Sequence, residues 1–178
     1  MSTPLVVVLC GSPADGAHCD AITQACATFG LEAVVRVASA HRTPLHALDI
    51  LRTYEAGYLA GRPTVLITVA GRSNALSGFA DPQVSMPVIA CPPPGDPVDV
   101  WSSLRMPAGV APVVVLEPAN AALAAAKMVG LVSPGVRAAV GAAQAAARQR
   151  VQDADEARHP AAGGHSDSDP APVPEDTP

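Results

Sequence analysis

The residues best suited to chemistry in this chain are His41 and Arg42, which stand side by side in the segment Ser39-Ala40-His41-Arg42-Thr43-Pro44. A histidine side chain can take up and release a proton near neutral pH. The guanidinium group of an arginine offers a forked set of donors to a phosphate or a carboxylate. The pair therefore predicts a proton shuttle beside an anion-binding group; the alternative is an ordinary solvated loop.

The position of this pair in the chain favours a functional role. The β-branched residues 32–38 predict a strand, and Thr43 followed by Pro44 predicts the N-cap and first turn of a helix. His41 and Arg42 thus follow the carboxyl end of a strand, and ligands bind at that edge of open α/β sheets. The remaining histidines lie in predicted helices or near the end of the chain and are interpreted as structural or solvent-facing: His18, His46, His159 and His165.

A second polar turn, residues 11–15 (GSPAD), follows a predicted strand at residues 5–10. It opens a helix, whose free N–H groups and positive dipole end suit a phosphate. Ser12 could add a hydroxyl donor. Asp15 could accept hydrogen bonds from sugar hydroxyls, or it could only cap the helix.

A third segment, residues 70–78 (AGRSNALSG), follows the apolar strand predicted at residues 64–69. Its Gly71, Ser73 and Asn74 would bring backbone and amide donors close to a ligand. The segment lacks the features of the nucleotide-binding P-loop and of the dinucleotide fingerprint. Because the carboxyl ends of parallel strands meet at one edge of a sheet, we expect the three polar loops to converge there, with Ser39 adding a further hydroxyl.

Alternating apolar runs and helical patterns predict an α/β fold. We expect a parallel, doubly wound sheet between two layers of helices, a three-layer αβα sandwich. The predicted strands cover residues 5–10, 32–38, 64–69, 87–90 and 111–116. The predicted helices cover residues 15–29, a segment opening at Pro44, residues 118–129 and residues 134–157.

We divide the chain into three parts. Residues 1–132 are expected to form the α/β domain. Residues 133–158 are expected to form an Ala-rich C-terminal helix that packs on this domain or on a neighbouring subunit. Residues 159–178 are expected to be a disordered acidic tail rich in Pro and Gly.

Composition excludes several classes of protein. The net charge of -5 comes from residues 151–178, which hold seven acidic residues against Arg158 alone, so the rest of the chain has no basic stripe for nucleic acid. No apolar segment approaches the ~20 residues of a membrane helix. The four cysteines lack metal-ligand spacing, and no signal peptide precedes residue 5. We therefore expect a cytoplasmic protein that binds no nucleic acid, membrane or metal, with reduced cysteines buried in its core.

Six motifs occur in order along the chain: GS-x-x-D, SAHRTP, AGRSNALSG, CPPP, DVWSSLRMPAG and LEPANAALAA. Together they closely resemble the phosphoribosylaminoimidazole carboxylases of purine biosynthesis. The GRSN sequence at residues 71–74 resembles class II, which adds carbon dioxide directly to aminoimidazole ribonucleotide. The resemblance implies a flavodoxin-like sandwich, an octamer with active sites near subunit contacts, and a lyase that needs no cofactor.

The resemblance also implies roles for individual residues. His41 would move the proton, and Gly71 and Ser73 would line the carboxyl-bearing pocket. From the chemistry of carboxylation we expect Ser73, Asn74 and backbone N–H groups to stabilise the new carboxylate. The ribonucleotide would be bound by Ser12, Asp15, Ser39 and Arg42. Two alternatives remain: a class I mutase, which also carries Arg at the position of Arg42 and moves a carboxyl group from nitrogen to carbon, and a non-catalytic nucleotide-binding protein.

Overall fold

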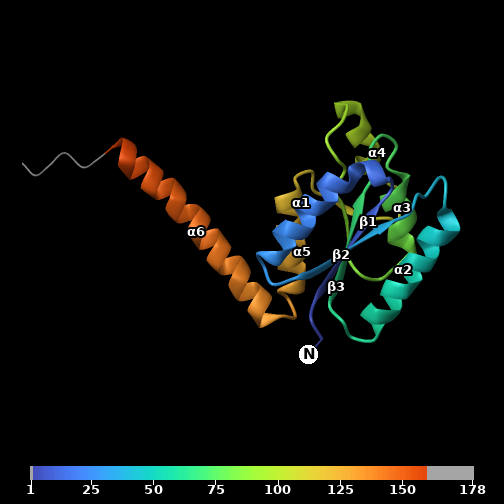
Figure 1. Ribbon diagram of the computed structural model, residues 1–178, viewed down its shortest axis with the longest axis horizontal. Coiled ribbons are helices and arrows are strands. Elements are labelled where there is room, and N and C mark those ends of the chain that lie inside the picture. The colour runs from blue at the N-terminus through green and yellow to red at the C-terminus, as the bar shows by residue number, and fades with distance from the viewer. Residues whose placement is uncertain (1, 160–178) are drawn as a thin grey trace, which may run out of the picture. The chain divides into compact units, whose positions relative to one another are not determined.

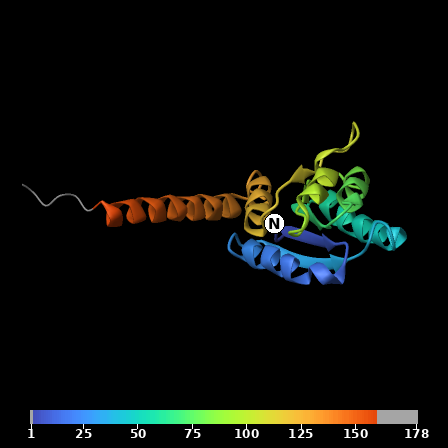
Figure 2. The same cartoon turned by 90° about the horizontal axis from the view of Figure 1, so that it is seen from above.

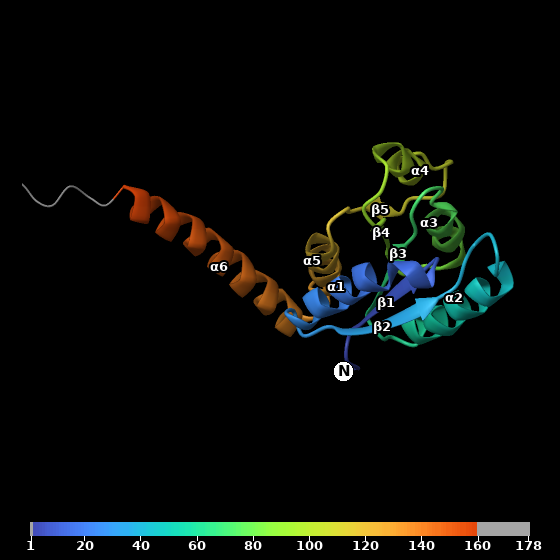
Figure 3. The ribbon, with the colours of Figure 1, turned by 45° about the horizontal axis from the view of Figure 1, so that its top comes forward.

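The computed structural model describes residues 2–159, and strands alternate with helices along most of this range (Figure 1). Five parallel strands form one sheet in the order β2-β1-β3-β4-β5 (Figure 3). The strands are β1 (Leu5–Cys10), β2 (Glu32–Val37), β3 (Thr64–Val69), β4 (Val88–Ala90) and β5 (Val113–Val114). The chain steps from β1 to one edge and then returns past β1 to β3, so the predicted flavodoxin-like winding is confirmed.

Six α-helices connect or follow these strands. They are α1 (Gly16–Ala27), α2 (Pro44–Leu59), α3 (Ala75–Ala80), α4 (Trp101–Leu104), α5 (Pro118–Val129) and α6 (Pro134–Arg158). Short 3-10 turns occupy η1 (Pro13–Asp15), η2 (Asp81–Gln83) and η3 (Pro97–Val100).

Most element boundaries agree with the sequence, and three elements differ. Gly30 and Gly61, which follow α1 and α2, have φ values of 70° and 94°, the left-handed conformation that glycine adopts at helix ends. The fifth strand is shorter than residues 111–116, because only two residues pair with β4. Two helices stand where the sequence predicted none: residues 75–80, which begin inside the third polar segment, form α3, and residues 101–104 form α4.

The core has two parts because side chains of the central strands alternate between the faces of the sheet. Val6 and Val8 pack with α1 and α5, whereas Leu5, Val7 and Leu9 pack with α2 and α3. Figures 1 and 2 show these two pairs of helices on opposite faces of the sheet. With both faces covered, every residue of β1 is buried, as its continuous apolar sequence predicts.

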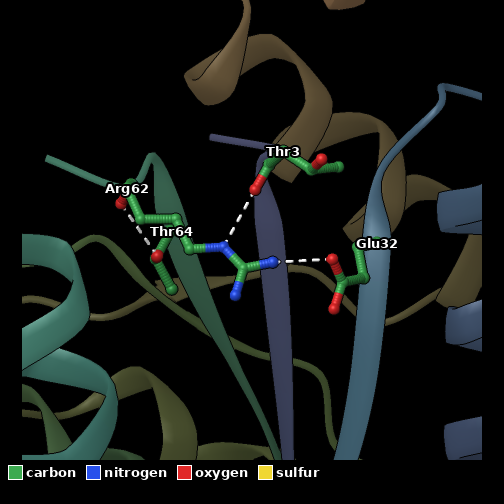
Figure 4. Close-up of polar contacts among 4 residues, drawn as sticks. All are labelled: Thr3, Glu32, Arg62 and Thr64. Atoms are coloured by element: carbon green, nitrogen blue, oxygen red, sulfur yellow. Dashed lines mark hydrogen bonds and ion pairs between the residues drawn. The ribbon is translucent and has the colours of Figure 1, made fainter. Parts of the chain in front are cut away.

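The amino ends of three strands are tied together by one side chain, that of Arg62 (Figure 4). Its Nε donates to the carbonyl oxygen of Thr3 at 2.9 Å, just before β1. Its Nη2 lies 2.6 Å from Oε2 of Glu32, the first residue of β2. Arg62 itself precedes β3, where the hydroxyl of Thr64 donates to the Arg62 carbonyl at 2.9 Å. This edge is opposite the carboxyl ends of the strands, where the polar loops lie.

The described chain divides into two compact units, one that ends at Ala142 and one that begins at Ala143. The first unit extends past the expected boundary at residue 132, since Val136 and Val140 belong to the core that contains α1 and α5. In the second unit, residues 145–158 are exposed. The predicted acidic tail at residues 159–178 lies outside the described residues except for His159. Within residues 2–159, no helix combines the length and apolar character required to cross a membrane.

Candidate active site

A cavity of ≈ 680 Å³ opens at the carboxyl ends of β1, β2 and β3. The strand order reverses at this point, because β2 and β3 lie on either side of β1, and such a crevice is the usual ligand site of doubly wound sheets. The structure thus brings the three predicted loops together. The lining residues are Gly11, Ser12, Ala14 and Asp15 of the first loop, Ser39 to Arg42 of the second, and Ala70 to Ser73 with Leu76 of the third.

The first loop presents a hydroxyl and a carboxylate. The Ser12 Oγ accepts a hydrogen bond from the Ala14 N–H at 3.3 Å and so caps the 3-10 turn η1. The side chain of Asp15 precedes α1 but makes no capping bond to it. Helix capping alone therefore does not account for Asp15, and its carboxylate can accept hydrogen bonds from a ligand in the cavity.

The second loop is a closed turn held by Ser39 and Thr43. The Thr43 Oγ1 accepts from the Ser39 N–H at 2.9 Å instead of capping α2, and the Thr43 N–H donates to the Ser39 carbonyl at 2.8 Å. The Arg42 N–H donates to the Ser39 Oγ at 3.2 Å, and the Arg42 Nη2 donates to the Gly11 carbonyl at 3.3 Å. These bonds join the second loop to the first and leave the side chain of His41 exposed at the cavity.

The third loop places only some of its predicted residues at the cavity. Gly71 and Ser73 line it, whereas Asn74 does not. Asn74 is 3% exposed: its Oδ1 accepts from the Ser77 N–H at 3.2 Å, and its Nδ2 donates to the Ser103 Oγ at 2.9 Å. Seven of the eight predicted site residues therefore line the cavity, and the side chain of Asn74 instead fixes the start of α3.

The cavity also contains a charged residue for which the sequence motifs predicted no role, Arg72. Its φ of 53° is left-handed, the only such value at a non-glycine residue within the described chain. With Arg42 it brings two guanidinium groups to a cavity whose one lining carboxylate is Asp15, so the charge balance suits an anionic ligand. The sequence could have indicated this role, because Arg72 lies inside the polar segment at residues 70–78, which was predicted to reach the site.

The cysteines lie outside the cavity lining, and all four are buried. A hydrogen bond from the Cys19 thiol lowers the pKa of Cys10 to about 7 and raises the pKa of Cys19. Burial raises the pKa of Cys26 to about 11 and that of Cys91 to about 12. The prediction that these cysteines fill the core is confirmed.

Comparison with known proteins identifies the family. A family model described as AIR carboxylase matches residues 5–150. The chain belongs to the AIR carboxylase family. It is 50% identical over 131 residues to the phosphoribosylaminoimidazole carboxylase of Treponema denticola, an alignment that covers 72% of this chain and 80% of the relative. It is 48% identical over 153 residues to that of Archaeoglobus fulgidus, with 84% and 82% covered.

The same family includes a similar solved structure. The crystal structure of Treponema denticola PurE superposes with a TM-score of 0.83 and 44% identity, over 87% of this chain and 98% of the other. The protein is therefore a carboxy-lyase of purine biosynthesis, with the flavodoxin-like fold that its motifs predicted.

Proposed function

We propose that the protein adds carbon dioxide directly to 5-aminoimidazole ribonucleotide and forms 4-carboxy-5-aminoimidazole ribonucleotide. The observation that carries this proposal is the convergence of His41, Arg42 and Ser73 on one cavity. Its ≈ 680 Å³ falls within the range of small-molecule sites, about 300–1,000 Å³. The relatives named phosphoribosylaminoimidazole carboxylase support the choice of substrate.

The first and second loops would bind the ribonucleotide. We assign the phosphate to Arg42 and to the hydroxyls of Ser12 and Ser39, since these donors lie on loops that the Arg42–Gly11 hydrogen bond joins. The carboxylate of Asp15, free of capping, would accept from the ribose hydroxyls. This arrangement holds the aminoimidazole ring near the third loop.

His41 would then act as the general base. The electron-rich ring carbon beside the amine attacks the carbon of carbon dioxide, a carbon–carbon bond forms, and one carbon–oxygen π pair moves to oxygen to give a carboxylate. The ring carbon still carries its hydrogen, and His41 removes this proton to restore the aromatic ring. General acid–base assistance of this kind contributes about 100- to 10,000-fold to a rate.

The third loop would bind the new carboxylate. Gly71 and Ser73 supply small groups and N–H donors at the cavity, and Arg72 adds a positive charge. Leu76 and Ala40 supply apolar lining that limits water around the carbon dioxide. The reaction as written uses no metal and no cofactor, because the amine already activates the ring carbon.

The decisive assay varies the form of dissolved carbon. Turnover of 5-aminoimidazole ribonucleotide is followed with carbon dioxide or bicarbonate added fresh, with and without carbonic anhydrase. We expect initial rates to follow carbon dioxide and to become independent of the added form once carbonic anhydrase is present. A class I mutase, to which Arg42 also conforms, would instead require the N-carboxy ribonucleotide and show no such dependence. Binding of ribonucleotide without any turnover would support the non-catalytic alternative.

We further propose that the protein is a homo-oligomer, an octamer as its motifs imply. The support is an apolar cavity of ≈ 650 Å³ near the amino ends of the strands, lined by Leu59, Leu131 and Val132, which are 72%, 80% and 64% exposed in the single chain. Large apolar patches of this kind mark protein interfaces. Sedimentation velocity should give an assembly of eight chains that Leu131→Asp dissociates; a wild-type monomer would refute the proposal.

We also propose that residues 145–158 of α6 pack against a protein surface in that assembly, because an Ala-rich helix this exposed gains little stability alone.

We propose a cytoplasmic location for the protein, and the free, buried cysteines agree with the reducing conditions there. Cell fractionation tests this location, and recovery of the protein outside the cytoplasmic fraction would exclude it.

A further inference from the structure

The hydroxyl of Ser102, on α4, lies beneath the third loop of the cavity and contacts its backbone twice. It accepts a hydrogen bond from the Asn74 N–H at 2.8 Å. Its own proton is shared between two carbonyl oxygens, that of Arg72 at 2.9 Å and that of Asp99 at 2.7 Å. One side chain 30 residues away in sequence thus links η3 to the loop.

These two loop contacts fix both peptide groups that flank Ser73. The Arg72 carbonyl belongs to the peptide before Ser73, and the Asn74 N–H belongs to the peptide after it. Within the described chain there are no cis peptide bonds, so each N–H points opposite to the carbonyl of its own peptide. The Ser73 N–H is therefore directed away from Ser102, while the Ser73 carbonyl accepts from the Ala75 N–H at 2.9 Å.

The conformation that Ser102 holds is not one that the loop would adopt by default. Arg72 has a φ of 53°, which places its Cβ unfavourably against its own backbone. Such residues persist where the surrounding structure fixes them. Ser102 holds the carbonyl of this residue, and the buried Asn74–Ser103 hydrogen bond holds the next turn, so α4 fixes the loop at two successive points.

We propose that Ser102 is a positioning residue for carboxylation: its hydroxyl sets the Arg72–Ser73–Asn74 backbone so that the Ser73 N–H and the Arg72 side chain meet the carboxyl group. The inference rests on the proposed function, which places that group at the third loop. Ser102 does not itself line the cavity. Its effect on the reaction passes through the backbone of its neighbours.

The test compares Ser102→Ala with Ser102→Thr, which keeps the hydroxyl, and with Ser85→Ala. Ser85 is a matched control because its exposed hydroxyl donates to Glu55 away from the cavity. We expect Ser102→Ala to lower kcat by about tenfold or more, which is less than the about 100- to 1,000-fold found when an oriented donor is itself removed. The Kd for the ribonucleotide should stay within about twofold, because Ser12, Ser39 and Arg42 are unchanged. Ser102→Thr should recover most of the rate.

Amide hydrogen exchange supplies a readout that does not depend on activity. In the wild type the Asn74 N–H donates a hydrogen bond to Ser102, so Ser102→Ala should accelerate its exchange by at least about tenfold, while Ser85→Ala leaves it unchanged.

Wild-type kcat together with unchanged exchange in Ser102→Ala would overturn the inference. A general loss of folding would instead raise the ribonucleotide Kd and speed exchange throughout α3 and α4, and it would also count against a positioning role. Should the wild type fail to carboxylate the ribonucleotide, the proposed function fails, and the exchange rates alone decide whether Ser102 holds the loop.

Discussion

Replacing Asn74 with alanine should destabilise the protein although the residue lies outside the cavity. The change removes the N-cap bond from the Ser77 N–H to Oδ1, and caps of this kind contribute about 1 kcal/mol. It also removes the bond from Nδ2 to the Ser103 Oγ, a buried hydrogen bond that contributes about 1 kcal/mol. Ser103 is only 2% exposed, so water does not readily replace the lost donor. We expect the free energy of unfolding to fall by about 2 kcal/mol.

Urea unfolding measures this loss directly. The midpoint should move to lower urea while the m value stays constant, which assigns the change to stability and not to the unfolded state. Ser73→Ala is the matched control on the same loop, because Ser73 is exposed and its substitution should change stability by less than about 0.5 kcal/mol. A loss below about 0.5 kcal/mol in Asn74→Ala would show that the two hydrogen bonds do not hold the loop and refute the reasoning.

Three further changes test other parts of the structure. Arg42→Ala should mainly raise the KM for the ribonucleotide in steady-state assays, and a collapsed kcat with unchanged KM would be incompatible with phosphate binding by Arg42. Glu32→Gln should cost less than about 1 kcal/mol in urea unfolding, because the Glu32 side chain is 54% exposed, and a much larger loss would mean that the Arg62 contact is stronger than an ordinary surface ion pair. Burial raises the pKa of Cys26 from the ordinary 9.0 to about 11, so the folded state keeps this proton longer than the unfolded state and stability falls as pH rises from 9 to 11. Cys26→Ala should therefore lose less free energy of unfolding over that range than the wild type; identical losses would rule out a contribution from Cys26.

The fold was predictable because its determinants are local and repetitive. Strands β1 and β3 are covered on both faces, and their unbroken apolar sequences marked them with the bounds that the structure shows. Helices α1 and α2 end just before Gly30 and Gly61, which adopt the positive φ values that glycine tolerates best. The length of β5 could not be predicted from the apolar run at residues 111–116. Only two of its residues pair with β4, and this pairing depends on a strand that is distant in the sequence.

The site was predictable to the level of the loops but not of every side chain. Seven predicted residues follow strands that end at the same edge, and topology alone brings them together. Asn74 lies outside the cavity and Arg72 lines it, because contacts with α4, about 30 residues further along the chain, hold the Asn74 side chain and the backbone of both residues. Thr43 likewise bonds to Ser39 instead of capping α2, which stabilises the turn that carries His41.

The most direct test of the account is the carboxylation rate of His41→Asn at saturating ribonucleotide and carbon dioxide, measured beside the Kd for the ribonucleotide. Asparagine keeps the size and polarity of the site but cannot accept the ring proton. We predict a rate at least about 100-fold below that of the wild type, with a Kd changed by less than about twofold. Near-normal turnover in this variant would show that another group removes the proton, and the mechanism built on His41 would be wrong.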